Sequence, residues 1–368
     1  MISYKFRILP TKAQETLMTK WLEECRMLYN NLVSQRKNGW EKNKKSFSLY
    51  DQLNRLPELK RTYPKLKTVY SQVLQNVGIR VDLAYQAFFR RLKRHEKPGY
   101  PRFKGYGRYD SFCYPCAIDI KLNEDSIKFP KIGMISAIFH REIKGKMKTA
   151  TIKRSHGKWY LVIVTDFVDN KKILKSNKTV AIDVGIETFA TLSDGNNILN
   201  PRFFERKQKA LAKVQRRLEK HKKEKSSRRI KKARRAISKV HEKIVNSRHN
   251  FVHQTTNKLI KEYGIIILED ININNLIKKR WCNKQILDAA WGSFTNILTN
   301  KAECAGRMVV KVNPAWTSQT CSKCGIRTLH ELKDRIFNCE CGYSANRDAN
   351  AAQNILTLGL QSLAMAKA

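Results

Sequence analysis

Two cysteine pairs lie close together near the end of the chain, Cys321 and Cys324 followed by Cys339 and Cys341. So short a segment cannot bury enough apolar surface to fold by itself, whereas four thiolates in two close pairs form a tetrahedral cage for zinc. Disulfide bonds are the alternative, but the N-terminal sequence MISYKFRILPTK lacks a secretory signal, which favours metal. We therefore predict one structural zinc ion in a ribbon that directly precedes a helix beginning near Asp348.

The chain is strongly basic. Lys and Arg number 73 against 31 Asp and Glu among 368 residues, which gives a formal net charge of +42. This excess is far greater than solubility requires, so the expected partner is a polyanion. A membrane is not favoured, because no apolar run approaches the roughly 20 residues of a spanning helix. The composition indicates nucleic acid as the partner of an intracellular protein, and the length allows two or three domains.

The first part of the chain combines strand and helix patterns. Residues 2–9 alternate polar and apolar side chains, as in a strand, and Thr11 has the spacing of a capping box that starts a helix. A second helix is predicted over residues 70–93, and the period of two returns between residues 111 and 166. The expected result is a small β-barrel or sandwich with a helical insertion. The bounds are residues 1–10 and 96–177 for the β part and 11–95 for the insertion.

Two segments of this part carry side chains suited to nucleic acid. The helix over residues 70–93 places Gln72, Gln75 and Arg80 away from its apolar face, where they suit base edges and phosphates but equally water. The loop KPGYPRFK, residues 97–104, alternates prolines with basic and aromatic residues, so it can place rings on bases and charges on phosphates. A solvated linker stiffened by proline is the alternative for this loop. The loop candidates are Tyr100, Arg102 and Lys104.

A second domain is predicted to begin at Lys178 and to be of the α/β class. Its elements follow the order strand, β-hairpin, helical hairpin, strand, helix (residues 281–305), strand and final helix, with the zinc ribbon of residues 316–344 before that last helix. The helical hairpin, residues 202–249, carries Lys or Arg on nearly every turn and reverses near Ser226. A solvated charged face usually explains such a run, but the one-sided charge favours a groove for nucleic acid. The domain bounds are residues 178–315 and 345–368.

Three acidic residues stand where this order of elements would bring them together. Asp183 lies in the apolar strand AIDVG, where an unpaired carboxylate would be costly. Glu269 ends the apolar strand IIILE, and Asp348 starts the final helix, whose dipole stabilises a carboxylate. The order of elements is that of the ribonuclease-H-like fold, in which the first and fourth strands are parallel neighbours. Such a cluster needs cations and suits two Mg²⁺ ions and phosphodiester cleavage, although a helix cap or salt bridge could explain each acid alone.

Four motifs of the chain resemble those of one family: AIDVGIETFATLSDG, IIILEDININNL, NPAWTSQTCSKCG and CGYSANRDANAAQNIL. They are similar to the TnpB (OrfB-type) proteins of bacterial insertion sequences. The resemblance extends to YKFRILPTKAQ, CRMLYNNLV, YPRFKG and FPKIGMI, and so to nearly the whole chain. Proteins of this family are RNA-guided DNA endonucleases related to type V CRISPR effectors, with a RuvC-like nuclease domain.

The resemblance implies a role for each feature described above. The three acids would be the catalytic triad and the four cysteines the zinc ligands, while residues 11–95 would form a recognition lobe and the β part a wedge domain. It also implies a guide RNA copied from the transposon end and a double-stranded DNA target beside a short transposon-adjacent motif. We expect a monomer in the RNA complex, in the cytoplasm and on the nucleoid when bound to DNA. One departure is Asn346, where the family usually has Asp.

In this family the adjacent motif is read largely by the recognition lobe. Ser71, Gln72 and Gln75 are spaced to share one face of their helix, and glutamine amides suit the N6/N7 edge of adenine. We therefore expect Gln72 and Gln75 to read the motif, with Tyr50 and Asn54 as lesser candidates. Solvated polar residues on an exposed helix are the alternative.

Two other functions fit parts of the same pattern. A guided DNA-binding repressor without nuclease activity would use the same basic surfaces, but it has no need of three clustered carboxylates. A DNA transposase or recombination accessory protein could share the nuclease fold, but an enzyme that joins strands usually assembles as a multimer, and the sequence indicates no dimer interface. An Mg²⁺-dependent endonuclease is the function that the sequence favours.

Overall fold

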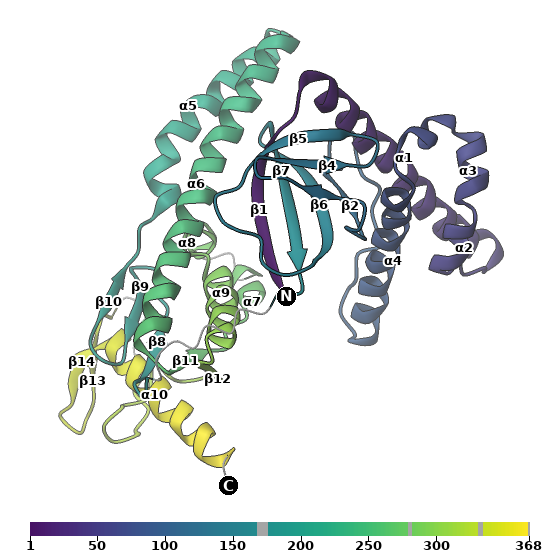
Figure 1. The fold of residues 1–368 in the computed structure, drawn as a ribbon. Coiled ribbons are helices and arrows are strands. Elements are labelled where there is room, and N and C mark those ends of the chain that lie inside the picture. Colours follow the sequence, from purple (N-terminus) through teal and green to yellow (C-terminus); the bar gives the residue numbers. More distant parts are fainter. Residues whose placement is uncertain (168–175, 279–281, 330–333, 367–368) are drawn as a thin grey trace. The chain divides into compact units, whose positions relative to one another are not determined.

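The computed structural model describes residues 1–167, 176–278, 282–329 and 334–366. The chain divides into two compact units, residues 1–168 and 169–368 (Figure 1), and each has its own sheet and its own hydrophobic core. The division falls just before Lys178, the predicted start of the second domain. Within the described ranges, no helix combines the length and the apolar character that crossing a membrane requires.

The first unit is built around a seven-stranded antiparallel sheet in the order β2-β6-β7-β1-β5-β4-β3. The N-terminal strand β1 lies in its middle, paired with β7 and β5, so it belongs with the later strands as predicted. No hydrogen bonding joins the outer strands β2 and β3 within the described residues, so hydrogen bonds do not close the sheet into the predicted barrel. The strands are β1 (Ile2–Leu9), β2 (Ser111–Tyr114), β3 (Lys121–Leu122), β4 (Ser126–Phe129), β5 (Gly133–Ile138), β6 (Met147–Ser155) and β7 (Lys158–Thr165).

The helices of this unit lie between β1 and β2 in the chain, as an insertion into the sheet. Thr11 caps the first of them with the predicted capping box, because its hydroxyl accepts from the Gln14 N–H at 3.3 Å and its own N–H donates to Gln14 Oε1 at 3.0 Å. Trp21, Leu32 and Val77 are buried in one core together with the strands, so the insertion and the sheet share a single core. The helices are α1 (Lys12–Asn43), α2 (Leu49–Asn54), α3 (Leu56–Thr62), the 3-10 helix η1 (Pro64–Thr68) and α4 (Ser71–Lys93).

The second unit contains a five-stranded mixed sheet in the order β10-β9-β8-β11-β12. Its first and fourth strands, β8 and β11, are parallel neighbours with Ile182 opposite Leu268, as predicted, and β12 runs parallel to β11 on the other side. Ile266 and Ile267 of β11 are fully buried, which explains why this strand is wholly apolar. The strands are β8 (Thr179–Asp183), β9 (Thr188–Leu192), β10 (Asn197–Leu199), β11 (Ile265–Glu269) and β12 (Met308–Val312).

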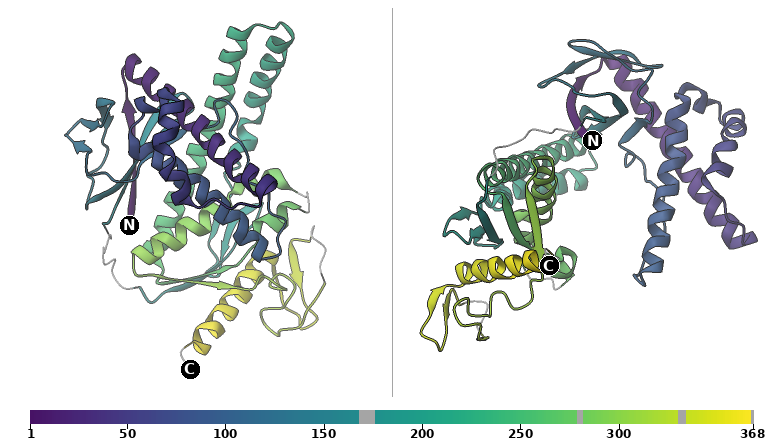
Figure 2. Two further views of the ribbon diagram at one scale, coloured as in Figure 1. Left: turned by 90° about the vertical axis from the view of Figure 1, so that its right-hand side faces the viewer. Right: turned by 60° about the horizontal axis from the view of Figure 1, so that its bottom comes forward.

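The last helix, α10, packs against β8, β11 and β12. Gly359 permits this close approach, because a Cβ atom there would lie 2.4 Å from Cδ1 of Ile267. Figure 2 shows α10 with the small β13–β14 hairpin at its N-terminal end. The remaining elements are α5 (Phe203–Lys223), α6 (Ser227–Glu262), α7 (Ile273–Lys278), α8 (Asn283–Ala289), α9 (Trp291–Cys304), β13 (Ile336–Asn338), β14 (Ser344–Asn346) and α10 (Arg347–Met365).

Two helical predictions for this unit had different outcomes. The helical hairpin is confirmed as α5 and α6, with the reversal next to Ser226, the N-cap of α6. The helical prediction over residues 281–305 is confirmed between Asn283 and Cys304, but as two helices, since Ala290, whose backbone is left-handed with φ of 56°, separates α8 from α9. Ala290 itself is neither Gly nor Pro, and the nearest glycine, Gly292, lies inside the first turn of α9. Trp281, the predicted first residue, lies outside the described residues.

Candidate active site and zinc ribbon

The three acids predicted to meet are carried by three elements that end or begin at one edge of the second sheet. Asp183 is the last residue of β8 and Glu269 the last of β11. Because these strands are parallel and in register, their C-terminal residues reach the same edge. Asp348 is the second residue of α10, and a Cβ atom at Gly185, just after β8, would lie 3.9 Å from Asp348 Oδ2. The Asp348 carboxylate therefore faces the end of β8.

The electrostatics of this edge couple Asp183 to the other two acids. Burial raises the pKa of Asp183 well above its ordinary value, the charges of Glu269 and Asp348 raise it further, and Arg347 opposes them. Burial also raises the pKa of Glu269, against the hydrogen bond that it accepts from Thr317. Buried, mutually repelling carboxylates favour a bound cation, which would stabilise their ionised forms.

The donor set at this edge fits divalent cations with oxygen ligands. The carboxylates of Asp183, Glu269 and Asp348 supply oxygen ligands from three elements that meet there. Mg²⁺ suits such donors, because it prefers oxygen, keeps several waters and uses only one or two carboxylates.

Asn346, the departure from the usual Asp, is the N-cap of α10. Its Oδ1 accepts from the N–H of Asp348 at 2.9 Å and of Ala349 at 3.3 Å. Asn and Asp are equally good N-caps. The substitution therefore keeps the cap that fixes the backbone of Asp348.

The raised pKa of Asp183 makes a prediction about stability. In buffer without Mg²⁺ we expect Asp183→Asn to stabilise the protein at neutral pH. The folded state holds the Asp183 proton to a higher pH than the unfolded state, whose pKa is about 3.9, so the free energy of unfolding falls as the pH rises above that value. Asn, which cannot ionise, avoids this loss. Thermal unfolding in buffer without Mg²⁺, measured from acidic to neutral pH, tests it.

The gain in stability from Asp183→Asn should vanish at about pH 4 and below, where Asp183 of the wild type is protonated in both the folded and the unfolded state. Added Mg²⁺ should stabilise the wild type more than the variant. A variant less stable than the wild type at neutral pH without Mg²⁺ would contradict the raised pKa.

The four ribbon cysteines form a compact cluster. The Sγ atoms of Cys321 and Cys341 are 3.8 Å apart, those of Cys324 and Cys339 are 3.5 Å apart, and all four lie within 4.8 Å of one another. A tetrahedral zinc ion with Zn–S bonds of about 2.3 Å has S···S edges of about 3.8 Å. The cluster can therefore hold one zinc ion, as the sequence predicts.

Each cysteine pair lies on a tight turn that ends in glycine. The N–H of Gly325 donates to the Cys321 carbonyl at 2.9 Å, and the N–H of Gly342 donates to the Cys339 carbonyl at 2.9 Å. The two glycines have φ of 79° and 81°, a left-handed conformation that side chains disfavour. The second pair, which has one residue fewer between its cysteines, is therefore also held on a turn that a glycine closes.

A contact that the sequence analysis did not identify joins the start of the ribbon to the acids. Thr317 is buried, and its hydroxyl donates to Glu269 Oε1 at 2.5 Å. Asn354 of α10 holds this segment from the other side, because its Nδ2 donates to the carbonyls of Thr317 at 2.8 Å and Thr320 at 2.6 Å. The position of Glu269 is thus tied to the ribbon and to α10. Thr317 lies in the motif NPAWTSQTCSKCG, which is the signal that could have drawn attention to it.

The predicted motif-reading residues lie on two neighbouring helices, α2 and α4. A Cβ atom at Gly78 of α4 would lie 2.9 Å from a Leu53 methyl of α2, so the helices pack closely. The candidates differ in exposure: Gln75 is exposed, while Gln72 is half-buried and its Oε1 has no hydrogen-bond partner among the described residues. Ser71 accepts from Lys60 Nζ at 2.9 Å. On α2, the exposed candidates are Tyr50 and Asn54.

The other predicted nucleic-acid residues fall into two groups. The guanidinium of Arg80 donates to the Ser111 carbonyl at 2.7 Å and to Asn76 Oδ1 at 3.0 Å, so it links α4 to β2. Lys104 is tethered at its backbone, where its N–H donates to Asn30 Oδ1 at 2.7 Å. All three loop candidates, Tyr100, Arg102 and Lys104, are exposed.

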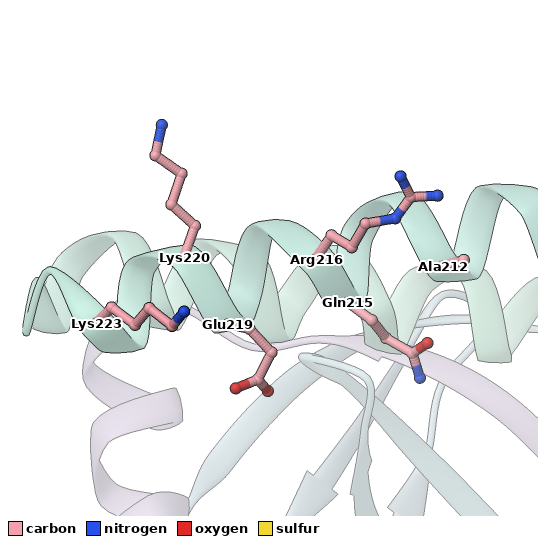
Figure 3. A pocket seen from close by; sticks show the side chains of 6 residues that line it. All are labelled: Ala212, Gln215, Arg216, Glu219, Lys220 and Lys223. Carbon is pink, nitrogen blue, oxygen red and sulfur yellow. The ribbon is translucent and has the colours of Figure 1, made fainter.

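The helical hairpin presents a large basic surface. Figure 3 shows Arg216 and Lys220 extending from one side of α5 and Gln215 and Glu219 from another. Ion pairs such as Lys222 with Glu219, at 2.7 Å, neutralise few of its cations, since acids are rare on both helices. The surface suits a polyanion.

Comparison with known proteins finds relatives that match nearly the whole chain and nearly the whole of their own length. The family model described as "Probable transposase" (OrfB_IS605) matches residues 162–280, "Cas12f1-like, TNB domain" matches 291–355 and "Helix-turn-helix domain" matches 1–45. "Putative RNA-guided DNA endonuclease InsQ" of Escherichia coli (strain K12) is 32% identical, covering 98% of this chain and 93% of its own. A "Putative RNA-guided DNA endonuclease" of Streptomyces pristinaespiralis is 28% identical, covering 98% of this chain and 90% of its own.

The fold also resembles a solved structure, "Cryo-EM structure of the Cas12f1-sgRNA-target DNA complex". The TM-score is 0.60 at 16% identity, over 94% of this chain and 83% of the other. These findings define a class of transposase-related proteins with a Cas12f-like fold. The chain belongs to the TnpB (OrfB-type) family.

Proposed function

We propose that the protein is a transposon-encoded, RNA-guided endonuclease that cuts double-stranded DNA beside a short transposon-adjacent motif. The observation that carries the proposal is the convergence of Asp183, Glu269 and Asp348 at one sheet edge, where the charges of Glu269 and Asp348 make Asp183 harder to ionise. The names of the relatives support the activity, and the guide RNA and target DNA of the Cas12f1 complex support the partners. A net charge of +42 suits both nucleic acids.

The nuclease domain in this proposal is RuvC-like, with a ribonuclease-H-like sheet. It comprises residues 178–315 and 345–368, and the zinc ribbon of residues 316–344 is inserted before the last helix. The strand order β10-β9-β8-β11-β12, with β8 and β11 parallel, supports it. In this proposal, DNA cleavage takes place at the sheet edge where β8 and β11 end.

The chemistry would be phosphodiester hydrolysis with two Mg²⁺ ions held by Asp183, Glu269 and Asp348. Bound there, these ions would supply an activated water and stabilise the leaving 3′ oxygen. The protein's own contribution is to hold the carboxylates in position. Thr317 fixes one carboxylate oxygen of Glu269, and Asn346 fixes the first turn of α10, from which Asp348 projects.

Nucleic-acid binding would be shared between the two units. The wedge domain (residues 1–10 and 96–177) and the recognition lobe (residues 11–95) would bind the guide RNA and the DNA flank. The basic surface of α5 and α6 would bind phosphates without regard to sequence, because it presents cations and few donors fixed for base edges. One copy of the chain would act per guide RNA, which is copied from the transposon end.

The experiment that tests the proposal begins with the RNA that copurifies with the protein. Sequencing should give one defined species, a portion of which pairs with the target DNA. Replacing that portion should redirect Mg²⁺-dependent cleavage to a plasmid that carries the new match beside a permitted flank. A mixed RNA population, or cleavage that ignores the replaced portion, would refute guidance.

The residues that read the flank can be tested in the same assay. We expect Gln72→Ala or Gln75→Ala to remove a preference for one base of the adjacent motif, at a cost of about 1–3 kcal/mol for the preferred base, because glutamine amides pair with adenine edges. A cleavage library with a randomised flank measures it. Gln86→Ala is the matched control, since Gln86 lies on the same helix and donates to Asp82 at 2.6 Å. If the flank preference is the same in both variants and the control, the motif is read elsewhere.

A further inference from the structure

The first unit contains a pocket of about 320 Å³ lined mainly by aromatic rings. It lies where the C-terminal end of α1, the segment after it and the C-terminal half of α4 meet the ring of Tyr100. Phe47 forms one wall by packing on α1 at Gly39, where a Cβ atom would lie 2.5 Å from its ring. The pocket has the size of a small-ligand site, and it contains none of the proposed catalytic or motif-reading residues.

The rings of this pocket are held in fixed orientations yet remain open to solvent. Phe88 packs edge-to-face on Tyr100 at 5.2 Å between centroids and on Phe89 at 5.3 Å. Trp40 and Phe89 nevertheless leave 54% of their surface exposed. A contiguous exposed aromatic surface beside polar residues is typical of a binding site.

Cations surround the rings and also lie beneath them. Arg36 is buried, hydrogen-bonded to Gln52 at 2.8 Å and to Asp82 at 2.9 Å, and its guanidinium lies 5.1 Å from the Tyr85 ring. At the rim, Lys44 Nζ lies 5.8 Å from the Trp40 ring. The second rim cation is Lys45, whose Nζ lies 5.3 Å from the Phe47 ring, and the last turn of α4 adds the basic residues Arg90, Arg91 and Lys93.

We propose that this pocket receives an unpaired base of the guide RNA. The base would stack on Trp40 and Phe89, and the rim cations would bind the phosphates on either side of it. Proteins recognise RNA mainly at single-stranded loops and bulges, whose bases stack on aromatic rings and on arginine. The inference rests on the proposed function, because it takes RNA as the ligand. An apolar side chain of a protein partner would cover the rings but would leave the basic rim without a counter-charge.

The test separates base stacking from phosphate binding. The full chain, stripped of copurified nucleic acid at high salt, is titrated with an oligoadenylate of about ten nucleotides and with an abasic sugar-phosphate chain of equal length. The wild type should bind the oligoadenylate more tightly. Trp40→Ala and Phe89→Ala should each weaken that binding about 10-fold or more and leave abasic binding unchanged. Trp40→Phe, which keeps a ring, should restore most of the affinity.

Tyr63→Ala is the matched control, because Tyr63 is an exposed aromatic residue outside the pocket. It should bind both chains like the wild type. Photo-crosslinking with 4-thiouridine in the copurified guide RNA should label peptides containing Trp40 or Phe89. Equal binding of both chains by the wild type and both alanine variants would overturn the proposal. So would variants that bind RNA normally but lose self-association, which would assign the pocket to a second copy of the chain.

Binding of the oligoadenylate does not require cleavage. If the nuclease proposal is wrong, guided cleavage will therefore be absent, however the pocket variants bind the oligoadenylate. Failure of the pocket proposal would appear as unchanged oligoadenylate binding in a protein that still cleaves under guidance.

Discussion

Replacing Asp183, Glu269 or Asp348 by alanine is expected to abolish DNA cleavage and to leave RNA and target binding within about twofold. The carboxylates would hold metal and not phosphate, so their loss removes catalysis without removing positive charge. Metal-assisted charge stabilisation contributes several kcal/mol to such reactions, which corresponds to a loss of about 10³-fold or more in rate. Single-turnover cleavage with saturating guide RNA, beside a gel-shift measurement of target binding, tests this.

Asp270→Ala is the matched control for these variants. Asp270 directly follows Glu269, but its carboxylate is exposed and pairs with Lys311 Nζ at 3.1 Å. This variant should cleave at nearly the wild-type rate, because its charge lies outside the proposed metal site. Any of the three site variants that keeps most of its Mg²⁺-dependent activity would remove that residue from the triad.

The sequence predicted the elements whose signal is local. The alternation in residues 2–9 indicated β1, and the apolar runs ending at Asp183 and Glu269 indicated two buried strands. Placing those two strands side by side required the whole order of elements, which matched a known topology. The cluster of four cysteines was predictable because close cysteine pairs at this spacing are typical of zinc sites.

What the sequence did not predict depends on contacts between distant residues or on backbone conformation without a sequence signal. Thr317 binds Glu269 across 48 positions, and nothing local to either residue indicates the pairing. The break between α8 and α9 falls on Ala290 in a left-handed conformation, where a glycine or proline would ordinarily be the signal. The aromatic pocket is assembled from separate segments of the chain, so its rings look like ordinary core residues in sequence.

Removal of zinc is expected to inactivate the protein although zinc takes no part in the chemistry. Cys324→Ser or Cys339→Ser should release the metal and disorder roughly residues 320–343, because the ribbon has little apolar surface to hold it folded. Zinc analysis, limited proteolysis and single-turnover cleavage measure the three effects. Cys304→Ser is the matched control, since Cys304 is an exposed thiol outside the ribbon. Wild-type protein without zinc would contradict the site.

We expect zinc removal to reduce activity by disturbing the segment around Thr317, which joins the ribbon to the sheet. Thr317 reaches Glu269, and Asn354 of α10 binds the carbonyls of Thr317 and Thr320, so a disordered ribbon releases a carboxylate that would hold metal. Thr317→Val separates the two effects, because it keeps the shape of the side chain and removes only the hydrogen bond. If the ribbon acts by positioning Glu269, this variant should retain zinc and still cleave more slowly, with a higher Mg²⁺ requirement. Full activity in Thr317→Val would show that the ribbon supports cleavage by another route, such as a contact with nucleic acid.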